Sequence, residues 1–214
     1  MLNVVGIIGS YIFVVVVMVL AKLFERFGEE ASRKFIHIML ANWWIIAMLC
    51  FDNVICAAIA PFSFVIINYI SYKKDLINVM EREKKDGLGT VYYAVSLLIL
   101  AIICFGIIKN PSIGLISVFV MGYSDGLAAV IGKNIKSKEY KVGNSTKTLL
   151  GSFTMFIVTM LIISIYLGVL GVSYWILKAL IASVVLTILE AVSIKGTDNI
   201  TVPLATCLLL CMLI

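Results

Sequence analysis

Residues 4–21 have the sequence VVGIIGSYIFVVVVMVLA, which contains no charged side chain. A helix needs about 20 mainly apolar residues to cross roughly 30 Å of hydrocarbon, so an uncharged run of this length predicts a membrane-spanning helix. A secretory signal would add a basic stretch before the apolar run and a small-residue cleavage pattern after it. Neither pattern is found here, and we expect the helix to be retained in the membrane.

Seven further apolar blocks follow along the chain. They cover residues 35–51, 54–70, 91–108, 113–131, 153–170, 174–189 and 200–214. Hydrophobic residues make up 62% of the 214 positions and charged residues 14%, whereas a soluble domain is about half apolar and a quarter charged. We therefore expect an all-α polytopic membrane bundle of about seven to eight transmembrane helices, in which the second and eighth blocks are short. No linker or strong repeat divides the chain, which favours one integral membrane domain over residues 1–214.

The basic residues are distributed asymmetrically. Fifteen of the 17 Lys and Arg residues follow the first, third, fifth and seventh blocks, and Lys109 and Lys178 fall on the other side. The positive-inside rule then places the basic segments in the cytoplasm and the N-terminus outside. This predicts a multi-pass protein of the cell membrane with a cytoplasmic active site. The net charge of +5 fits an anionic leaflet and an anionic substrate equally well, and we expect no nucleic-acid partner.

Two acidic residues lie within apolar blocks. Asp125 is part of GYSDGLAA, residues 122–129, and Glu190 closes the seventh block. A carboxylate near the bilayer centre costs about 2.5–3.5 kcal/mol and usually faces a bundle interior or a watery cavity. Two acids at one membrane level can hold a divalent cation such as magnesium. The alternative is structural, because Gly122 and Gly126 have the GxxxG spacing of close helix contacts, across which Asp125 can hydrogen-bond.

Residues 132–152 combine lysines, glycines and hydroxyl groups before an apolar helix. Free backbone N–H groups at a helix N-terminus bind phosphate readily. The segment is not a Walker motif, because the order GxxxxGK[ST] is absent. A basic loop that is merely solvated and touches lipid headgroups explains the composition equally well.

His37, the only histidine, lies with Arg33 and Lys34 at the start of the second block. Their spacing predicts a cationic face on one helix. The alternative pairs Glu29 with Arg33 and Glu30 with Lys34 on a surface helix, but it leaves His37 without an exposed position.

Another polar group, residues 195–203, joins the last two blocks. Asp198 and Asn199 can cap the following helix, and Pro203 suits a first helical turn. Ligand binding by Asp198 and Asn199 is the alternative to capping.

Together these residues resemble the CTP-dependent lipid kinases, which include dolichol kinase, phytol kinase and the fungal-type diacylglycerol kinase and are related to the phosphatidate cytidylyltransferases. The resemblance extends from about Arg33 to Pro203. It rests on Arg33-Lys34-x-x-His37, Asp125-Gly126-x-Ala128-Ala129-x-x-Gly132, Lys147-Thr148-x-x-Gly151-Ser152 and Glu190-x(7)-Asp198-Asn199-x-x-x-Pro203. Each motif is short, but their order, spacing and common membrane side make the combination specific.

The resemblance implies transfer of the γ-phosphate of CTP to the hydroxyl of a membrane lipid alcohol, with Mg²⁺ as the divalent cation. The alcohol would be a polyprenol, a phytol-like isoprenoid alcohol or diacylglycerol. The implied catalytic residues are Asp125, Lys147 and His37, and the implied metal ligands are Asp125, Glu190 and Asp198. The implied nucleotide-binding residues are Arg33, Lys34, Gly87, Gly89, Thr90, Gly126, Gly132, Lys133, Thr148, Gly151, Ser152 and Asn199. A homodimer is the assembly that we consider for such a kinase.

Two other functions stay open at this stage. A cytidylyltransferase acting on a lipid phosphate would also use CTP, a metal and a lipid oxygen nucleophile. The chain lacks the Gly-rich Asp-Arg-x-Asp ending of that branch, which favours the kinase. A small membrane transporter with Asp125 and Glu190 in an ion path is the second alternative, although such a protein should have polar groups near mid-membrane and exits on both faces.

Overall fold

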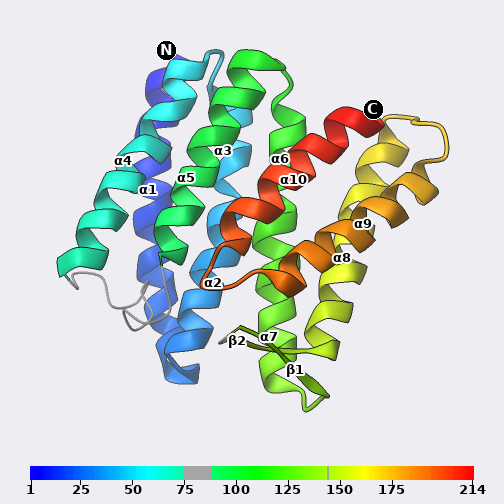
Figure 1. Ribbon diagram of the computed structural model, residues 1–214. Helices are drawn as coiled ribbons and strands as arrows, with labels where there is room; N and C mark the ends of the chain where they lie inside the picture. The colour runs from blue at the N-terminus through cyan, green and yellow to red at the C-terminus, as the bar shows by residue number, and fades with distance from the viewer. Residues whose placement is uncertain (75–87, 144) are drawn as a thin grey trace.

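The chain forms a bundle of long apolar helices (Figure 1). The structure is a computed structural model that describes residues 1–74, 88–143 and 145–214. Within these ranges, six helical stretches are long and apolar enough to cross a membrane. They are Leu2–Phe27, Val54–Lys74, Gly89–Ile107, Pro111–Asn134, Leu149–Val169 and Trp175–Val192. The prediction of an all-α polytopic membrane bundle is therefore confirmed.

Three of these stretches are single α-helices, and three change helix type along their length. The single helices are α4 (Val54–Lys74), α8 (Leu149–Val169) and α9 (Trp175–Val192). Helix α1 (Leu2–Ala21) ends in a 3₁₀ turn, and α5 (Gly89–Ala101) continues as a π-helical segment, Ile102–Ile107. A second π-helical segment, Val120–Asp125, joins α6 (Pro111–Phe119) to α7 (Gly126–Asn134). Such wide turns are rare and frequently mark functional sites.

The second and eighth apolar blocks form shorter helices, as expected. The second block forms α2 (Glu29–Ala41) and α3 (Trp43–Cys50), and the eighth forms α10 (Asp198–Leu213). Asn42 separates α2 from α3, and its side-chain amide donates to the Met39 carbonyl at 3.1 Å. Local bonds of this kind compete with the helical hydrogen-bond ladder.

A small β-hairpin between α7 and α8 was not predicted from the sequence. Strands β1 (Glu139–Val142) and β2 (Ser145–Thr148) are antiparallel, with Tyr140 opposite Lys147. Gly143 has a φ of 56°, which glycine adopts without strain and which suits a tight turn. The pairing holds Lys147 in a fixed register at the end of the bundle where α7 ends and α8 begins (Figure 1).

Small residues allow the central helices to approach one another closely. A Cβ atom added at Gly122 would meet the side chain of Ala41, and one added at Gly126 would meet Ile38. Both glycines therefore pack the α6–α7 stretch directly against α2. Gly132 and Gly151 make a similar contact between α7 and α8. The GxxxG interpretation is correct for the helix packing, and it does not exclude a role for Asp125 in a site.

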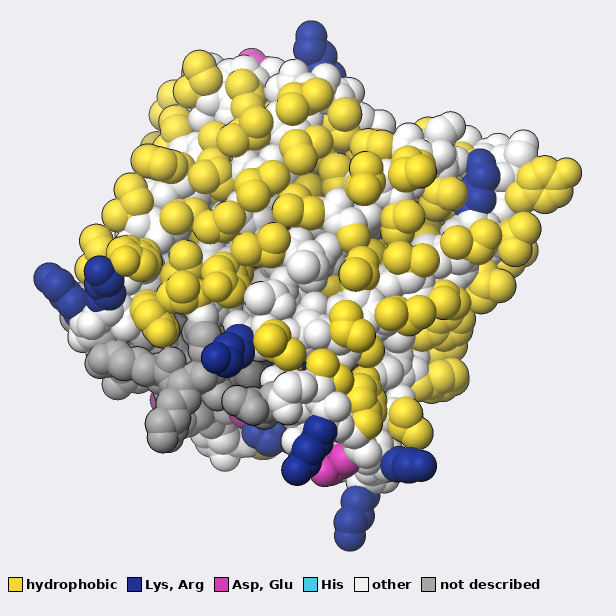
Figure 2. All heavy atoms as spheres, viewed as in Figure 1, with side chains coloured by type: hydrophobic (Ala, Val, Ile, Leu, Met, Phe, Trp, Pro, Cys, Tyr) yellow, Lys and Arg dark blue, Asp and Glu magenta, His cyan; other side chains and the backbone are white. Residues whose placement is uncertain are grey.

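The outer surface of the bundle is strongly apolar. Hydrophobic side chains cover most of the face drawn in Figure 2, and most Lys and Arg side chains visible there lie toward the lower edge. Exposed large hydrophobic residues occur on α1, α4, α8 and α9. This surface fits contact with lipid hydrocarbon. The side that faces the cytoplasm, and with it the outside position of the N-terminus, stays a prediction.

Candidate active site

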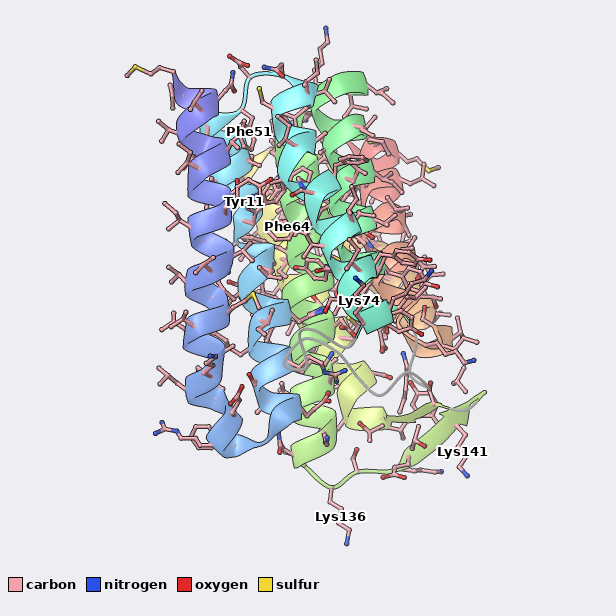
Figure 3. All side chains as sticks on the ribbon, turned by 90° about the vertical axis from the view of Figure 1, so that its left-hand side faces the viewer. Tyr11, Phe51, Phe64, Lys74, Lys136 and Lys141 are labelled. Atoms are coloured by element: carbon pink, nitrogen blue, oxygen red, sulfur yellow. The ribbon has the colours of Figure 1, made fainter. Side chains whose placement is uncertain are left out.

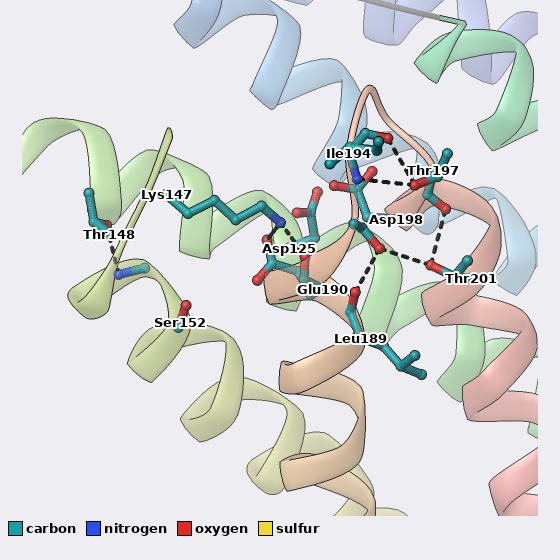
Figure 4. Close-up of polar contacts among 12 residues, drawn as sticks. Asp125, Lys147, Thr148, Ser152, Leu189, Glu190, Ile194, Thr197, Asp198 and Thr201 are labelled. Carbon is teal, nitrogen blue, oxygen red and sulfur yellow. Dashed lines mark hydrogen bonds and ion pairs between the residues drawn. The ribbon is translucent and has the colours of Figure 1, made fainter. Parts of the chain in front are cut away.

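Three carboxylates from distant parts of the chain meet inside the bundle. Asp125 ends the π-helical segment before α7, Glu190 lies in the last turn of α9, and Asp198 begins α10 (Figure 4). One oxygen from each carboxylate lies within 4.8 Å of the other two. Asp125 and Glu190 are each only 7% exposed. Like charges this close disfavour ionisation unless cations offset them.

Two lysines and a histidine from α2 and from the hairpin face these carboxylates. Lys34 Nζ lies 3.4 Å from Asp125 Oδ2, and His37 Nε2 lies 3.3 Å from the same oxygen. Lys147 of β2 contacts both the carboxylate and the backbone carbonyl of Glu190. Four segments predicted to share one site are thus brought together, and the motif lysines and histidine point at the motif acids.

The wide turn and the glycines around Asp125 direct its side chain toward α2. Gly122 and Gly126 face Ala41 and Ile38, so the backbone of this stretch lies directly against the helix that carries Lys34 and His37. His37 is held from a second direction, because the hydroxyl of Tyr93 donates to the His37 carbonyl at 3.1 Å. The rings of Tyr93 and His37 also meet edge to face, 5.0 Å apart. The position of the histidine is therefore set by α5 as well as by α2.

Asn199 is fixed by an unusual contact with α5. Pro203 lies in the second turn of α10 rather than in the first, at the position whose N–H would normally bond to the carbonyl of Asn199. Because proline has no N–H, that carbonyl lacks its helical donor. The hydroxyl of Ser96 donates to that carbonyl instead. The side-chain amide of Asn199 donates to the Gly89 carbonyl at 3.0 Å, whereas its buried Oδ1 has no hydrogen-bond partner among the described residues. The amide is thus held rigidly, with one unused acceptor.

The capping prediction for this segment is only partly correct. Asp198 Oδ1 accepts a hydrogen bond from the adjacent N–H of Asn199 at 3.0 Å. Asn199 itself bonds to Gly89 of α5 rather than to the first turn of its own helix. Its side chain therefore serves contact between helices, and its buried position is compatible with the ligand-binding alternative.

A cavity of about 200 Å³ begins at this cluster and continues into the bundle. Its polar end is lined by Arg33, Lys34, His37, Thr90, Asp125 and Asp198. Its apolar part is lined by residues of α1, α2, α3, α4 and α5, which include Met18, Leu40, Trp43, Phe64, Ile67 and Leu97. A charged end joined to an apolar groove suits an amphiphilic ligand with a single polar end.

The sequence of this chain is similar to those of known phytol kinases. It is 29% identical over 221 residues to the phytol kinase of Synechocystis, with 96% of this chain and 89% of that protein covered. This similarity to the phytol kinases supports the lipid kinase family that the motifs resemble. A probable chloroplastic phytol kinase of Triticum aestivum is 26% identical, with 84% of this chain and 66% of that protein covered. Phytol kinase 1 of Arabidopsis thaliana is 29% identical, with 84% and 65% covered.

No family model matches the chain, and no solved structure is significantly similar to it. The chain spans about nine tenths of the Synechocystis protein and about two thirds of the plant proteins. The relatives named above are kinases, so the relationship to cytidylyltransferases stays a prediction.

The donor set of this lipid kinase fits the divalent cation that its family resemblance implies. Mg²⁺ prefers carboxylate and other oxygen ligands, and three carboxylates converge within 4.8 Å. The buried Oδ1 of Asn199, the residue after Asp198, adds a neutral acceptor that bonds to no other group in the part of the chain that the structure describes. The chemistry of these groups therefore agrees with the predicted metal ligands Asp125, Glu190 and Asp198.

Other predicted residues of the lipid kinase lie outside the cavity lining or have structural contacts. Lys133 is exposed near the end of α7, and Gly87 lies outside the described residues. Thr148 caps α8 by accepting the Gly151 N–H at 3.1 Å, and Ser152 bonds to Tyr140 at 2.6 Å. Arg33 lines the cavity and pairs with Glu30. The nucleotide-binding roles of these residues stay predictions.

Several residues of the site were missed by the sequence analysis. Asn68 of α4 lines the cavity and donates to the Thr90 carbonyl at 3.1 Å. Tyr93 and Ser96 of α5 hold His37 and Asn199 as described above. Each is a polar residue within an apolar block, which is the signal that singled out Asp125. A search for uncharged as well as charged polar residues within the apolar blocks would have found Asn68, Tyr93 and Ser96.

Proposed function

We propose that the protein transfers the γ-phosphoryl group of CTP to the hydroxyl of a membrane lipid alcohol at the cytoplasmic face. Kinship with the phytol kinases supports a lipid alcohol as the acceptor. The observation that carries the proposal is the meeting of three carboxylates, two lysines and one histidine at the polar end of an apolar groove. We propose CTP as the phosphate donor because the motifs of this chain resemble those of the CTP-dependent lipid kinases.

Phosphoryl transfer depends mainly on positioning and on neutralising charge, because its transition state is loose. In the proposed site, Lys34 of α2 supplies positive charge next to Asp125, and Lys147 of β2 supplies it next to Glu190. A magnesium ion held here would supply positive charge to offset the negative charge of the phosphate groups. Asp125, Glu190 and Asp198, with the free acceptor of Asn199, would hold this ion.

Asp125 has a further role in the proposal, because it lines the cavity directly. A carboxylate at this position can accept a hydrogen bond from the lipid hydroxyl and take its proton during transfer. His37 and Lys34 hold the carboxylate in place through their contacts with its Oδ2 atom. The alcohol would thus approach from the groove, and the triphosphate from the side of Lys147 and the hairpin.

The direct test is a transfer assay with the purified protein in detergent or nanodiscs. CTP labelled at the γ position is offered with phytol, geranylgeraniol, a polyprenol or diacylglycerol, and the labelled lipid is separated by chromatography. Transfer of γ label supports the kinase, whereas transfer of α label would identify a cytidylyltransferase. Unlabelled ATP and GTP as competitors test the choice of CTP.

Two matched variants make this assay specific to the site. Asp125→Asn should abolish transfer, because the amide can neither take the proton nor carry charge for the metal. Asp52→Asn makes the same change at an exposed position bonded to Asn3, and it should leave transfer unchanged. Full activity of folded Asp125→Asn would remove this residue from the mechanism.

A further inference from the structure

Among the described residues, the apolar part of the cavity reaches the apolar outer surface of the bundle on one side. Ile67 of α4 lines the cavity and is also 41% exposed, and Met18 of α1 lines it from the facing helix. An apolar side chain that belongs both to a cavity wall and to the outer surface forms the edge of an opening. Figure 3 shows α1 and α4 moving apart from one another toward the end that carries Lys74.

Contacts close the gap between α1 and α4 at the opposite end. The hydroxyl groups of Tyr11 and Ser63 bond at 2.9 Å, and the rings of Tyr11 and Phe64 lie 5.7 Å apart. Asn3 bonds to Asp52 at 2.8 Å, close to the start of α4. The two helices are therefore tied at the end that is far from the acid cluster, and the opening lies nearer the site.

Trp43 closes the inner end of the groove. Its side chain is only 3% exposed, and its ring nitrogen donates to Ser10 Oγ at 2.8 Å. Trp43 follows His37 by about 9 Å along the helix axis, at about 1.5 Å per residue. Only a short length of hydrocarbon fits between the polar cluster and this ring. A longer chain must leave the groove sideways.

We propose that the lipid alcohol enters from the bilayer between α1 and α4, with Met18 and Ile67 at the edges of the opening. The first part of its hydrocarbon chain lies in the groove below Trp43, and the remainder stays in the membrane. This inference rests on the proposed function for its choice of ligand. The occupant follows from the lining, since a molecule with one hydroxyl and one apolar chain matches the charged end and the apolar groove.

Narrowing the opening should therefore affect long alcohols more than short ones. Ile67→Trp and Met18→Trp are compared in nanodiscs with geranylgeraniol, which has 20 carbons, and with a five-carbon prenyl alcohol, which fits within the groove. We expect kcat/KM for the long alcohol to fall by about tenfold or more relative to the short one. Ile66→Trp and Val19→Trp make the same change at neighbouring exposed positions outside the cavity lining, and they should leave this ratio unchanged. An equal loss for both alcohols in the edge variants would overturn the proposal.

A second measurement does not depend on catalysis. A geranylgeraniol analogue with a diazirine near its hydroxyl is cross-linked by light, and the labelled peptides are identified by mass spectrometry. Labelling of α4 and α5 around Phe64 and Leu97 that is reduced in Ile67→Trp supports the groove. If the protein is labelled in this way but transfers phosphate from no nucleotide, the proposed function fails and the groove still stands. Active protein that is labelled instead on α8 or α9 would leave the kinase standing and reject the lateral opening.

Discussion

Ser96 donates its hydroxyl to the carbonyl of Asn199, the acceptor that Pro203 leaves without its helical donor. A proline inside a helix normally costs stability because it removes one backbone hydrogen bond. Here a side chain from α5 replaces that bond and ties α5 to the start of α10, next to Asp198. The proline thus leaves the Asn199 carbonyl free to accept from Ser96, and this bond joins α5 to α10 at the site.

Ser96→Ala should lower both thermal stability and transfer activity. The change leaves a buried carbonyl unpaired, which costs about 1–3 kcal/mol, and it releases the segment that carries Asp198 and Asn199. In the double variant Ser96→Ala/Pro203→Ala, the restored N–H of residue 203 can bond to the carbonyl, so part of the stability should return. Thermal unfolding in detergent measures this recovery. A double variant no more stable than Ser96→Ala would contradict the explanation.

Lys147→Met should reduce kcat/KM for the nucleotide by about 10²–10³-fold, because it removes a positive charge directed at the transferred group. Lys141→Met alters an exposed lysine on the same hairpin and serves as the control. Initial rates at varied CTP concentration separate the two variants. Similar effects of both changes would indicate a general role of hairpin charge, in place of the specific contact with Glu190.

Removing divalent cations with EDTA should abolish transfer, and adding Mg²⁺ should restore it. Glu190→Gln and Asp198→Asn should raise the Mg²⁺ concentration needed for half-maximal rate by about tenfold or more, since each loses a charged ligand. Glu139→Gln, on the exposed strand β1, should not change this concentration. Titration of Mg²⁺ at saturating CTP tests the metal site, and an unchanged Mg²⁺ requirement in both acid variants would count against it.

Gly122→Ala should destabilise the bundle, because the new Cβ would overlap with the side chain of Ala41. Overpacking of this kind typically costs about 1–3 kcal/mol, and the displaced α2 would carry Lys34 and His37 away from Asp125. Gly9→Ala adds the same group on α1 where no atom lies within 4 Å, so it should be neutral. The midpoint of thermal unfolding compares the two variants. Equal midpoints would show that α2 adjusts to the added methyl group at little cost.

The helices could be predicted from the sequence because each apolar block carries its own signal. The eight blocks all occur as helices, and the two short ones are those that fall below spanning length. The hairpin was missed because its strands carry little signal. Tyr140 and Val142 alternate with charged residues in β1 over only four positions, and β2 (Ser145–Thr148) contains no apolar residue. Its role became visible only in the contact between Lys147 and Glu190.

Asp125 and Glu190 could be singled out in advance, because charged residues within apolar blocks are unusual. Lys147 and Asp198 lie in polar connecting segments, and they were assigned to the site through the family resemblance of their motifs. The groove could not be predicted, since its lining is ordinary for membrane helices. Trp43, Phe64 and Ile67 come from helices whose relative position depends on packing, and nothing in their local sequence separates them from lipid-facing neighbours. The same holds for Tyr93 and Ser96, whose partners are distant backbone carbonyls.

The π-helical segment Val120–Asp125 has a consequence for how such chains diverge. A relative in which the same number of residues formed an ordinary α-helix would have everything after this stretch rotated by about 100° about the axis. The aspartate would survive in an alignment yet face another neighbour. Residue spacing inside this turn is therefore as much a part of the acid cluster as the identity of its carboxylates.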